Sequence, residues 1–368
     1  LTPDVISQPH PAQAILHASP VEPRFVVSAD TQMYLRKSNP SGNEKIGNAE
    51  KQIFFSPTGD YEVFRADVRY AASNTFIYQV TNSIDRHVVA EAEMGAAIKS
   101  STLWIGLEVD KRVTSINGLS FYFDWRNDIN RDRHFRLLPL AKWFLGDEEL
   151  EVKPGRYVYG TTSEQSELSE EFDVSRKIEL HTQKHYNERF ATITSDVKTP
   201  LDELRQKYPP EFDDIFSFLD LENFKDELLW VKICFPQSFP LPAIDNAFCA
   251  VNCFPVINRR LHEINYRLQR DINIIPLETE DLFLNIKTIQ DNRGAHYISN
   301  PVANLKDFEA GSYTLRQGGV GRFDSRNARE MLAYIFDLLR DESAAFSAFG
   351  NEMLSGKIRQ LKQTLASI

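Results

Sequence analysis

The stretch FCAVNCFPVINRRLHEINYRLQRDINIIPLETEDLFLNIKTI, residues 248–289, decides the fold class of this chain. It opens with a mostly apolar run that ends at the basic turn Asn258-Arg259-Arg260. Two further runs of strand-forming residues follow, at residues 264–275 and 282–289, and turn-forming or polar residues separate them. Short apolar runs bounded by turn residues predict consecutive β-strands with one buried face.

The part of the chain before this stretch also has the pattern of β-strands. Residues 61–70 and 75–80 are rich in strand-forming side chains. Apolar residues alternate with other residues over 103–109 and again over 119–125, and the turn-forming pair Asn117-Gly118 lies between these runs. Strict alternation predicts half-buried, largely antiparallel strands. We therefore expect a β-sandwich or barrel-like domain over residues 24–160.

The length of 368 residues favours two or three domains. We predict a mainly β fold with some α (α+β): two antiparallel β-sandwich or barrel-like domains, a helical connector and a C-terminal helical segment. The predicted parts are an extended lead-in (1–23), a first β-rich domain (24–160), an acidic linker and helical connector (161–227), a second β-rich domain (228–310), and a Gly-rich turn with C-terminal helices (311–368).

Local signals place the helices of this organisation. Thr199-Pro200 has the pattern of an N-cap followed by proline at the first helical position. Phe212, Ile215, Phe216 and Leu219 have the spacing of one face of an amphipathic helix. Apolar residues between 331 and 339 predict a helix near the C-terminus, and residues 349–365 predict a second one.

Composition excludes several classes of function. The net charge of −10 makes the chain a poor electrostatic match for nucleic acid, whose phosphates are bound by basic residues. No apolar run is long enough to span a bilayer, so we expect no direct membrane insertion, and no secretory leader is recognisable. The three cysteines, Cys234, Cys249 and Cys253, are expected to be reduced and buried in a cytosolic protein.

Four patterns invite a chemical interpretation, and each is incomplete. Gly318-Gly319-Val320-Gly321 lacks the Lys-Ser/Thr of a phosphate loop, and Cys249-x3-Cys253 lacks a second pair of metal ligands. His181-x3-His185 lacks the glutamate of the zinc motif, and its flanks have the composition of a strand. Asp147-Glu148-Glu149 follows Gly146 in what we expect to be an exposed turn. We therefore predict no catalytic residues, no cofactor and no metal site.

The opening stretch resembles the C-terminal half of the TssF/VasA family, which are baseplate wedge subunits of bacterial type VI secretion systems. The matching residues are Cys253, Pro255, Val256, Asn258, Tyr266 and Pro276. After the asparagine the family usually has Leu-Phe, whereas this chain has Arg259-Arg260. Because of this departure, the resemblance does not define the exact partner surface of this chain.

Other landmarks of this family occur in the same order along the chain. A proline approach, residues 9–11, precedes Ala14-Ile15-Leu16, and Leu119-Ser120-Phe121-Tyr122 precedes an expected helical stretch at residues 133–145. The tail, with Gly-Gly-Val-Gly-Arg-Phe-Asp at 318–324, resembles the Bacteroidetes-type branch. The helical N-terminal region of the family has no counterpart before the prolines, so we expect this chain to lack it.

The resemblance implies a structural protein of a contractile injection machine that nucleates sheath and tube. Its implied partners are a TssG-like wedge subunit, a TssK-like adaptor, a second copy of itself, and sheath and hub components. Its implied location is a cytoplasmic baseplate docked at the inner membrane complex. The candidate partner-binding residues are Phe254, Pro255, Asn258, Arg259, Arg260, Arg316, Gly318, Gly319, Arg322 and Phe323.

Two other interpretations of the sequence stay open. A carbohydrate-binding or carbohydrate-active β-sandwich protein would also be rich in strands and aromatic residues, and it would use exposed aromatic platforms or an opposed carboxylate pair. A baseplate protein of a phage tail or of an extracellular contractile injection system would be hard to separate from the first interpretation by sequence.

Overall fold

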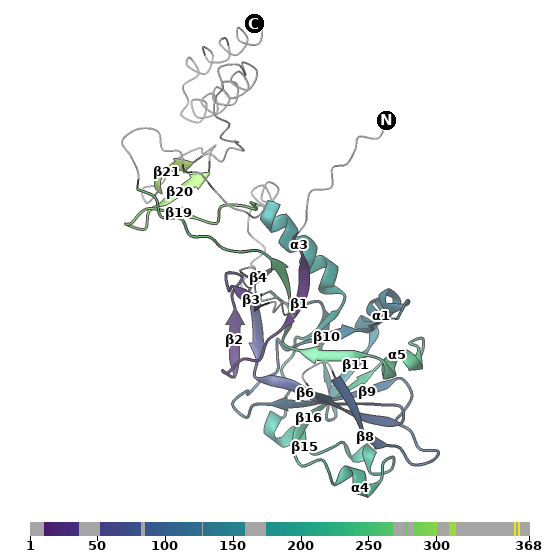
Figure 1. Cartoon of the computed structure of the whole chain (residues 1–368). Helices are drawn as coiled ribbons and strands as arrows, with labels where there is room; N and C mark the ends of the chain where they lie inside the picture. The colour runs from purple at the N-terminus through teal and green to yellow at the C-terminus, as the bar shows by residue number, and fades with distance from the viewer. Residues whose placement is uncertain are drawn as a thin grey trace, which may run out of the picture. The chain divides into compact units, whose positions relative to one another are not determined.

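The computed structural model divides the chain into two compact units, Leu1–Glu278 and Thr279–Ile368. The structure describes residues 11–36, 52–81, 85–126, 128–158, 174–267, 283–299 and 309–313, together with residues 275, 277, 357 and 360. The described part is mainly β, with several antiparallel sheets, which confirms the predicted fold class at this level (Figure 1).

The largest element of the first unit is an eight-stranded antiparallel sheet. Seven of its strands follow the order β12-β11-β16-β9-β6-β7-β8, and β15 also pairs with β16. The strands are β6 (Ala66–Ser73), β7 (Phe76–Thr81), β8 (Asp85–Glu91), β9 (Thr102–Val109), β11 (Lys142–Leu145), β12 (Glu148–Leu150), β15 (Arg205–Gln206) and β16 (Leu228–Cys234).

A four-stranded sheet packs against one face of this large sheet. Its order is β13-β14-β10-β17, and it consists of β10 (Ser120–Asp124), β13 (Val152–Pro154), β14 (Phe190–Ile193) and β17 (Phe248–Val251). Phe121 and Phe123 of β10 share a buried cluster with Ile105 of β9 and Val231 of β16. The two sheets thus form a sandwich around the main hydrophobic core.

The other face of the large sheet is also covered, which corrects the prediction that β9 is half-buried. Trp104 on β9 and Trp230 on β16 point to this second face and pack with Phe212 and Phe216. In β9 every residue except Glu108 is buried. The alternation in the sequence therefore marks which of two cores each side chain enters, because both faces are apolar.

A second four-stranded sheet, with the order β1-β18-β4-β3, lies beside the sandwich. It consists of β1 (Gln13–His17), β3 (Met33–Arg36), β4 (Gln52–Pro57) and β18 (Cys253–Asn258), and a separate pair joins β2 (Arg24–Val27) to β5 (Tyr61–Phe64). The predicted lead-in therefore contains a strand, β1, which pairs with β18 from Gln13↔Ile257 to His17↔Cys253.

The sheets cross the boundary that the sequence suggested between two β-rich domains. β16 pairs with β9 and β11, while β17 pairs with β10. Strands from residues 228–258 are thus integrated with strands from residues 24–160. Strand pairing is a long-range property, so a division of the sequence at the acidic linker does not predict which strands share a sheet.

Helices are few and short in the described residues. They are α1 (Arg131–Leu137), α3 (Val174–Asn187), α4 (Phe218–Leu221) and α5 (Leu241–Asp245), with 3-10 turns η1 (Leu138–Leu140), η2 (Leu201–Leu204) and η3 (Pro210–Phe212). The helical stretch expected at 133–145 ends early, because β11 begins at Lys142. A helical turn, η2, begins near Thr199-Pro200 as expected, but its N-cap is Pro200 and its first helical residue is Leu201, so the predicted positions were wrong by one residue.

Two helix predictions were wrong. The flanks of His181 are helical rather than strand-like, since His181 lies within α3. The amphipathic helix expected over Phe212–Leu219 is instead split into η3 and α4. Phe212 and Phe216 are buried, but Leu219 is 75% exposed. Pro209 and Pro210 restrict the backbone at the start of η3, and Ser217 is the N-cap at which α4 begins.

The described strands of the second unit form a small sheet of β19 (Ile289–Gln290), β20 (His296–Ser299) and β21 (Glu309–Tyr313). β20 and β21 are parallel. The two further strands expected after residue 260 are absent from the described residues 264–267, 275 and 283–288. The predicted C-terminal helices lie outside the described residues, except that Lys357 and Gln360 are helical.

Candidate functional site

The strand β18 contains the first group of predicted contact residues, and it buries two of them. Phe254 and Pro255 are in the core, because β18 is an inner strand between β1 and β4. As candidate contact residues Phe254 and Pro255 would have to be exposed, and their burial contradicts this choice. Asn258 at the end of the strand is exposed, and the accessible part of the predicted surface begins there.

Asn252 occupies the corner at which the chain leaves one sheet and enters another. It lies between β17, in the sandwich, and β18, in the second four-stranded sheet. Its φ of 56° is in the left-handed region, which asparagine tolerates better than most residues. Its side chain accepts a hydrogen bond from Phe64 N at 2.8 Å and donates to Phe64 O at 2.6 Å and Ala66 O at 2.8 Å. The corner is therefore tied to the β5–β6 junction.

Arg259 joins four segments of the first unit. Its guanidinium forms an ion pair with Glu179 of α3, and it donates to Ser56 Oγ at 2.7 Å, Pro57 O at 2.7 Å and Ala29 O at 3.1 Å. The side chains of Arg259 and Glu179 are only 9% and 14% exposed. Arg259 therefore stabilises the fold of the first unit. The sequence does not predict this role; it shows only that Arg259-Arg260 replaces the Leu-Phe that is usual in the family.

Arg260, the next residue, points to a different environment. Its guanidinium lies over the ring of Phe54 at 4.6 Å, and Phe54 lies 6.2 Å from the ring of Tyr34. Leu35 and Leu261 are 59% and 51% exposed. The backbone N–H of Leu261 donates to the side chain of Gln32, which joins the segment after β18 to the start of β3.

We call the group Tyr34, Phe54, Arg260 and Leu261 the Arg260 surface; Leu35, the residue after Tyr34 in β3, points to the opposite face of the sheet. It combines two aromatic side chains with one arginine, and aromatic residues and arginine are enriched in protein–protein interfaces. Among the described residues, this group is the accessible surface that adjoins the predicted contact residues 254–260. The second predicted group, Arg316, Gly318, Gly319, Arg322 and Phe323, lies outside the described residues.

Arg156 is a buried cation that no pattern in the sequence singles out. It donates to Ser120 Oγ at 2.6 Å and to the carbonyl oxygen of Glu62, and its guanidinium lies 5.4 Å from the centre of the Tyr61 ring. Burial lowers the pKa of Arg156 to about 10, which leaves it protonated at neutral pH. Burial also raises the pKa of Tyr61 to about 12. These contacts hold β5 against β10.

The histidine and cysteine patterns do not form a reactive or metal-binding site among the described residues. His181 and His185 lie one turn apart on the exposed side of α3, yet no group of three potential metal ligands occurs in the described part of the chain. Cys249 and Cys253 are buried, as expected, whereas Cys234 is half-buried. Burial raises the pKa of Cys253 to about 12 and that of Cys249 further, so neither is a thiolate at neutral pH.

Of the acidic group after Gly146, only Asp147 lies in the exposed turn between β11 and β12; Glu148 and Glu149 belong to β12, and Glu148 is half-buried, so the expected exposed turn was only partly right. Glu148 accepts hydrogen bonds from Lys198 N at 2.8 Å and from Thr199 N at 3.0 Å, and bonding to Thr199 lowers its pKa. Glu149 pairs with Lys142 at 3.7 Å. These carboxylates hold neighbouring segments together, and they do not face each other across a cleft.

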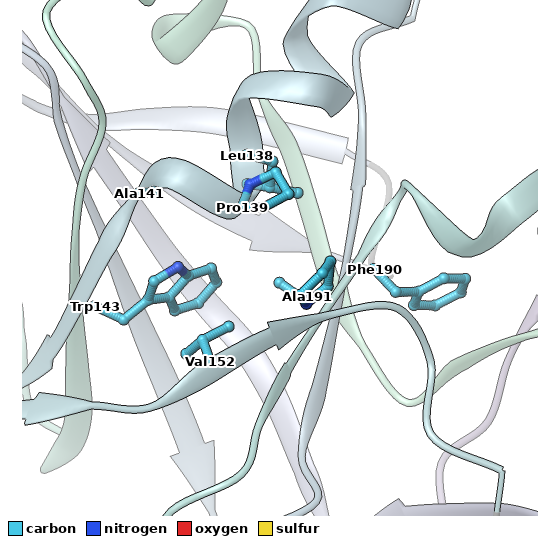
Figure 2. Close-up of a pocket in the computed structure, with 8 residues that line it drawn as sticks. Leu138, Pro139, Ala141, Trp143, Val152, Phe190 and Ala191 are labelled. Carbon is cyan, nitrogen blue, oxygen red and sulfur yellow. The ribbon is translucent and has the colours of Figure 1, made fainter.

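The pocket drawn in Figure 2 has a volume of about 10 Å³, the space of roughly one water molecule. Its lining is apolar and includes Trp143, Val152, Leu138 and Ala191. Figure 2 shows the Phe190 ring directed away from Trp143. A cavity of this size and lining cannot hold an organic substrate, so the accessible surfaces are the better candidates for function.

No family model matches this chain, and no curated protein matches it. Among solved structures, it is similar to a chain in a cryo-electron microscopy structure of the type VI secretion system TssK-TssF-TssG baseplate subcomplex. The sequence identity is 14% and the TM-score is 0.37. The match covers 79% of this chain and 51% of the other, so this chain spans about half the length of that protein.

A separate observation concerns membranes. Within the part of the chain that the structure describes, none of the helices has both the length and the apolar character needed to cross a bilayer.

Proposed function

We propose that this chain is a TssF-like structural subunit of the baseplate of a contractile injection machine. In this role it assembles with a TssG-like wedge subunit and a TssK-like adaptor and helps to nucleate the sheath and tube. Its task is architectural and requires no cofactor. The proposal places it in a cytoplasmic baseplate, with a second copy of itself in the same wedge.

The observation that carries the proposal is the meeting of three sequence landmarks. Ala14-Ile15-Leu16 on β1 pairs with Phe254-Pro255-Val256 on β18. Phe121-Tyr122 on β10 pairs with Ala250-Val251 on β17, immediately before the same β18 motif. Landmarks more than 100 residues apart in the sequence are thus neighbours in the fold. Chance matches to a family pattern would have no reason to meet in this way, so the landmarks form one structural unit.

The Arg260 surface is the proposed contact for the TssG-like partner. It lies where β18 ends, at the place where this chain departs from the usual family sequence. An arginine supported by an aromatic ring offers both a charge and a flat apolar area to a partner. The neighbouring Arg259 is occupied by contacts within the chain, so it supports the surface without being part of it.

The test is co-expression of this chain with the TssG-like protein of the same organism, followed by light scattering to measure the mass of the complex. A stable complex with more than one copy of this chain is the expected result. Replacing Arg260 with Glu and Tyr34 with Ser should weaken the complex. Leu140→Ser, at an exposed residue elsewhere, is the matched control and should leave the complex unchanged.

Two results would count against the proposal. If both folded proteins remain separate, the baseplate role loses its main physical consequence. In that case binding to a panel of polysaccharides would test the carbohydrate-binding alternative. If the complex forms and both variants bind equally well, the baseplate role stands and the Arg260 surface is not the contact.

A further inference from the structure

A second surface, on the far side of the large sheet, has exposed apolar side chains that the proposed function does not use. Met94 is 105% exposed, and Phe218 and Leu219 are 69% and 75% exposed. The backbone brings these residues to one place: Glu93 N donates to Ile215 O at 3.0 Å, and Ala92 forms a β-bridge with Phe216. The segment carrying α4 therefore lies along the end of β8.

The exposure of Phe218 and Leu219 is fixed by the packing of their neighbours. Phe212 and Phe216 are buried, with ring centres 5.3 Å apart, and Phe212 lies 5.5 Å from Trp230. Ser217 caps α4 by accepting a hydrogen bond from Asp220 N at 3.2 Å. With the cap in place, Leu221 points into the core and Phe218 and Leu219 point outward. The two side chains are thus displayed by a well-packed element.

Acidic residues surround this apolar group. Between residues 207 and 227 there are seven acidic residues and two lysines, so this segment carries 2 − 7 = −5 of the net charge of −10. Asp214, Glu222, Glu91 and Glu93 are exposed, and Glu222 lies one helical turn after Phe218. Glu211 is already paired with Lys232 at 2.6 Å. We call Met94, Phe218, Leu219 and the exposed acids Glu91, Glu93, Asp214 and Glu222 the acidic edge.

We propose that the acidic edge binds a lysine- or arginine-rich amphipathic segment of a protein partner. The apolar side chains of that segment cover Phe218, Leu219 and Met94, and its basic side chains pair with the surrounding carboxylates. Charge complementarity selects this occupant, because an acidic or neutral apolar segment would leave the carboxylates partly desolvated without a partner. Large apolar side chains exposed together and rimmed by polar residues are typical of protein interaction sites.

The acidic edge is distinct from the Arg260 surface, and its role does not depend on the baseplate proposal. The eight-stranded sheet separates it from the main core, since its anchors Phe212 and Phe216 belong to the second hydrophobic cluster. A change at one surface should therefore leave binding at the other unaffected, which allows the two proposals to fail separately.

The test is fluorescence anisotropy with this chain and a labelled amphipathic peptide of leucine and lysine at helical spacing. A second peptide has every lysine replaced by glutamate. The lysine peptide should bind the chain and the glutamate peptide should not. The double variant F218S/L219S should weaken binding by about tenfold or more. The variant E93Q/E222Q should weaken it less and reduce its dependence on salt.

Ile129→Ser is the matched control, because Ile129 is 96% exposed on a different part of the chain. It should bind as the unchanged chain does, and circular dichroism should be the same for all variants, since none of the substituted side chains is buried. Equal binding by F218S/L219S, or equal loss in the Ile129→Ser control, would overturn the proposal. A dimer of the unchanged chain that F218S/L219S abolishes would also overturn it, because a second copy would then be the occupant.

Discussion

Strand β18 and the segment of the acidic edge are both rich in large apolar side chains, and the fold uses them in opposite ways. Phe254 in β18 is fully buried against Tyr61, at a ring separation of 5.5 Å. Phe218, at the start of α4, is 69% exposed although its neighbour Phe216 is buried. The difference follows from what covers each element. β18 has a strand on each side and α3 beside it, whereas the described residues provide no cover for the outer side of α4.

The largest difference in stability is expected between the alanine variants of Phe254 and Phe218. Phe254→Ala should lower the free energy of unfolding by about 3–5 kcal/mol, because it leaves a cavity in a close-packed core. Phe218→Ala should change it by less than about 0.5 kcal/mol, as expected for an exposed side chain. Urea unfolding of both variants measures this. Similar losses for the two would mean that Phe218 is covered in the folded chain.

The corner at Asn252 should give the next largest effect. Asn252→Ala removes three hydrogen bonds to buried backbone and places alanine at a positive φ, so we expect a loss of about 3 kcal/mol. Asn252→Gly removes the same bonds but tolerates the backbone conformation, and it should cost about 1 kcal/mol less. Thermal unfolding distinguishes the two contributions. Glycine behaving no better than alanine would assign the whole effect to the hydrogen bonds.

The adjacent residues Arg259 and Arg260 provide the same comparison between a buried and an exposed side chain of one residue type. Arg259→Met removes the ion pair between Arg259 and Glu179 and should cost about 2–3 kcal/mol, since both side chains of this pair are largely buried. Arg260→Met should change stability by less than about 0.5 kcal/mol. The matched pair keeps the side-chain length similar, and urea midpoints report the difference. Equal sensitivity would show that Arg260 has a structural role as well.

The smallest effect should come from the half-buried carboxylate of Asp110, the residue after β9. A hydrogen bond from Arg112 lowers the pKa of Asp110 from 3.8 to about 2. The ionised form is favoured in the folded chain, so its contribution is present above about pH 4 and is lost as the pH falls through about 2. Asp110→Asn should therefore be less stable than the unchanged chain at pH 5, and the difference should shrink as the pH falls and vanish below about pH 2. Parallel pH curves would contradict this.

The local pattern of the sequence predicted the strands well where burial is strong. The runs at 61–70, 75–80, 103–109 and 119–125 all contain strands, and Ala14-Ile15-Leu16 is β1 as the family resemblance implied. The helix α3 was missed because few of its side chains enter the core. Ile178 and Thr182 are buried, while His181 and His185 are exposed. Its position depends on contacts from elsewhere, such as Gln183 donating to Thr58 O at 2.6 Å.

The role of residues 254–260 in partner binding stays a prediction. The sequence identified the region around residues 254–260, but it could not distinguish Phe254 in the core from Arg260 at the surface. Nor could it separate the roles of Arg259 and Arg260, which differ only in what lies beside them. The sequence around the acidic edge led to a wrong prediction. The spacing of Phe212, Ile215, Phe216 and Leu219 is that of one helix face, but the structure splits this segment into η3 and α4.

The sequence by itself determined that this chain is mainly β, because runs of strand-forming residues bury their side chains at a spacing that local backbone geometry dictates. It also determined the acidic charge and the absence of a complete catalytic motif. Only the tertiary structure decided which strands share a sheet, which face of β9 enters which core, and which aromatic residues remain exposed. These outcomes depend on contacts between residues far apart in the chain, and local pattern carries no information about them.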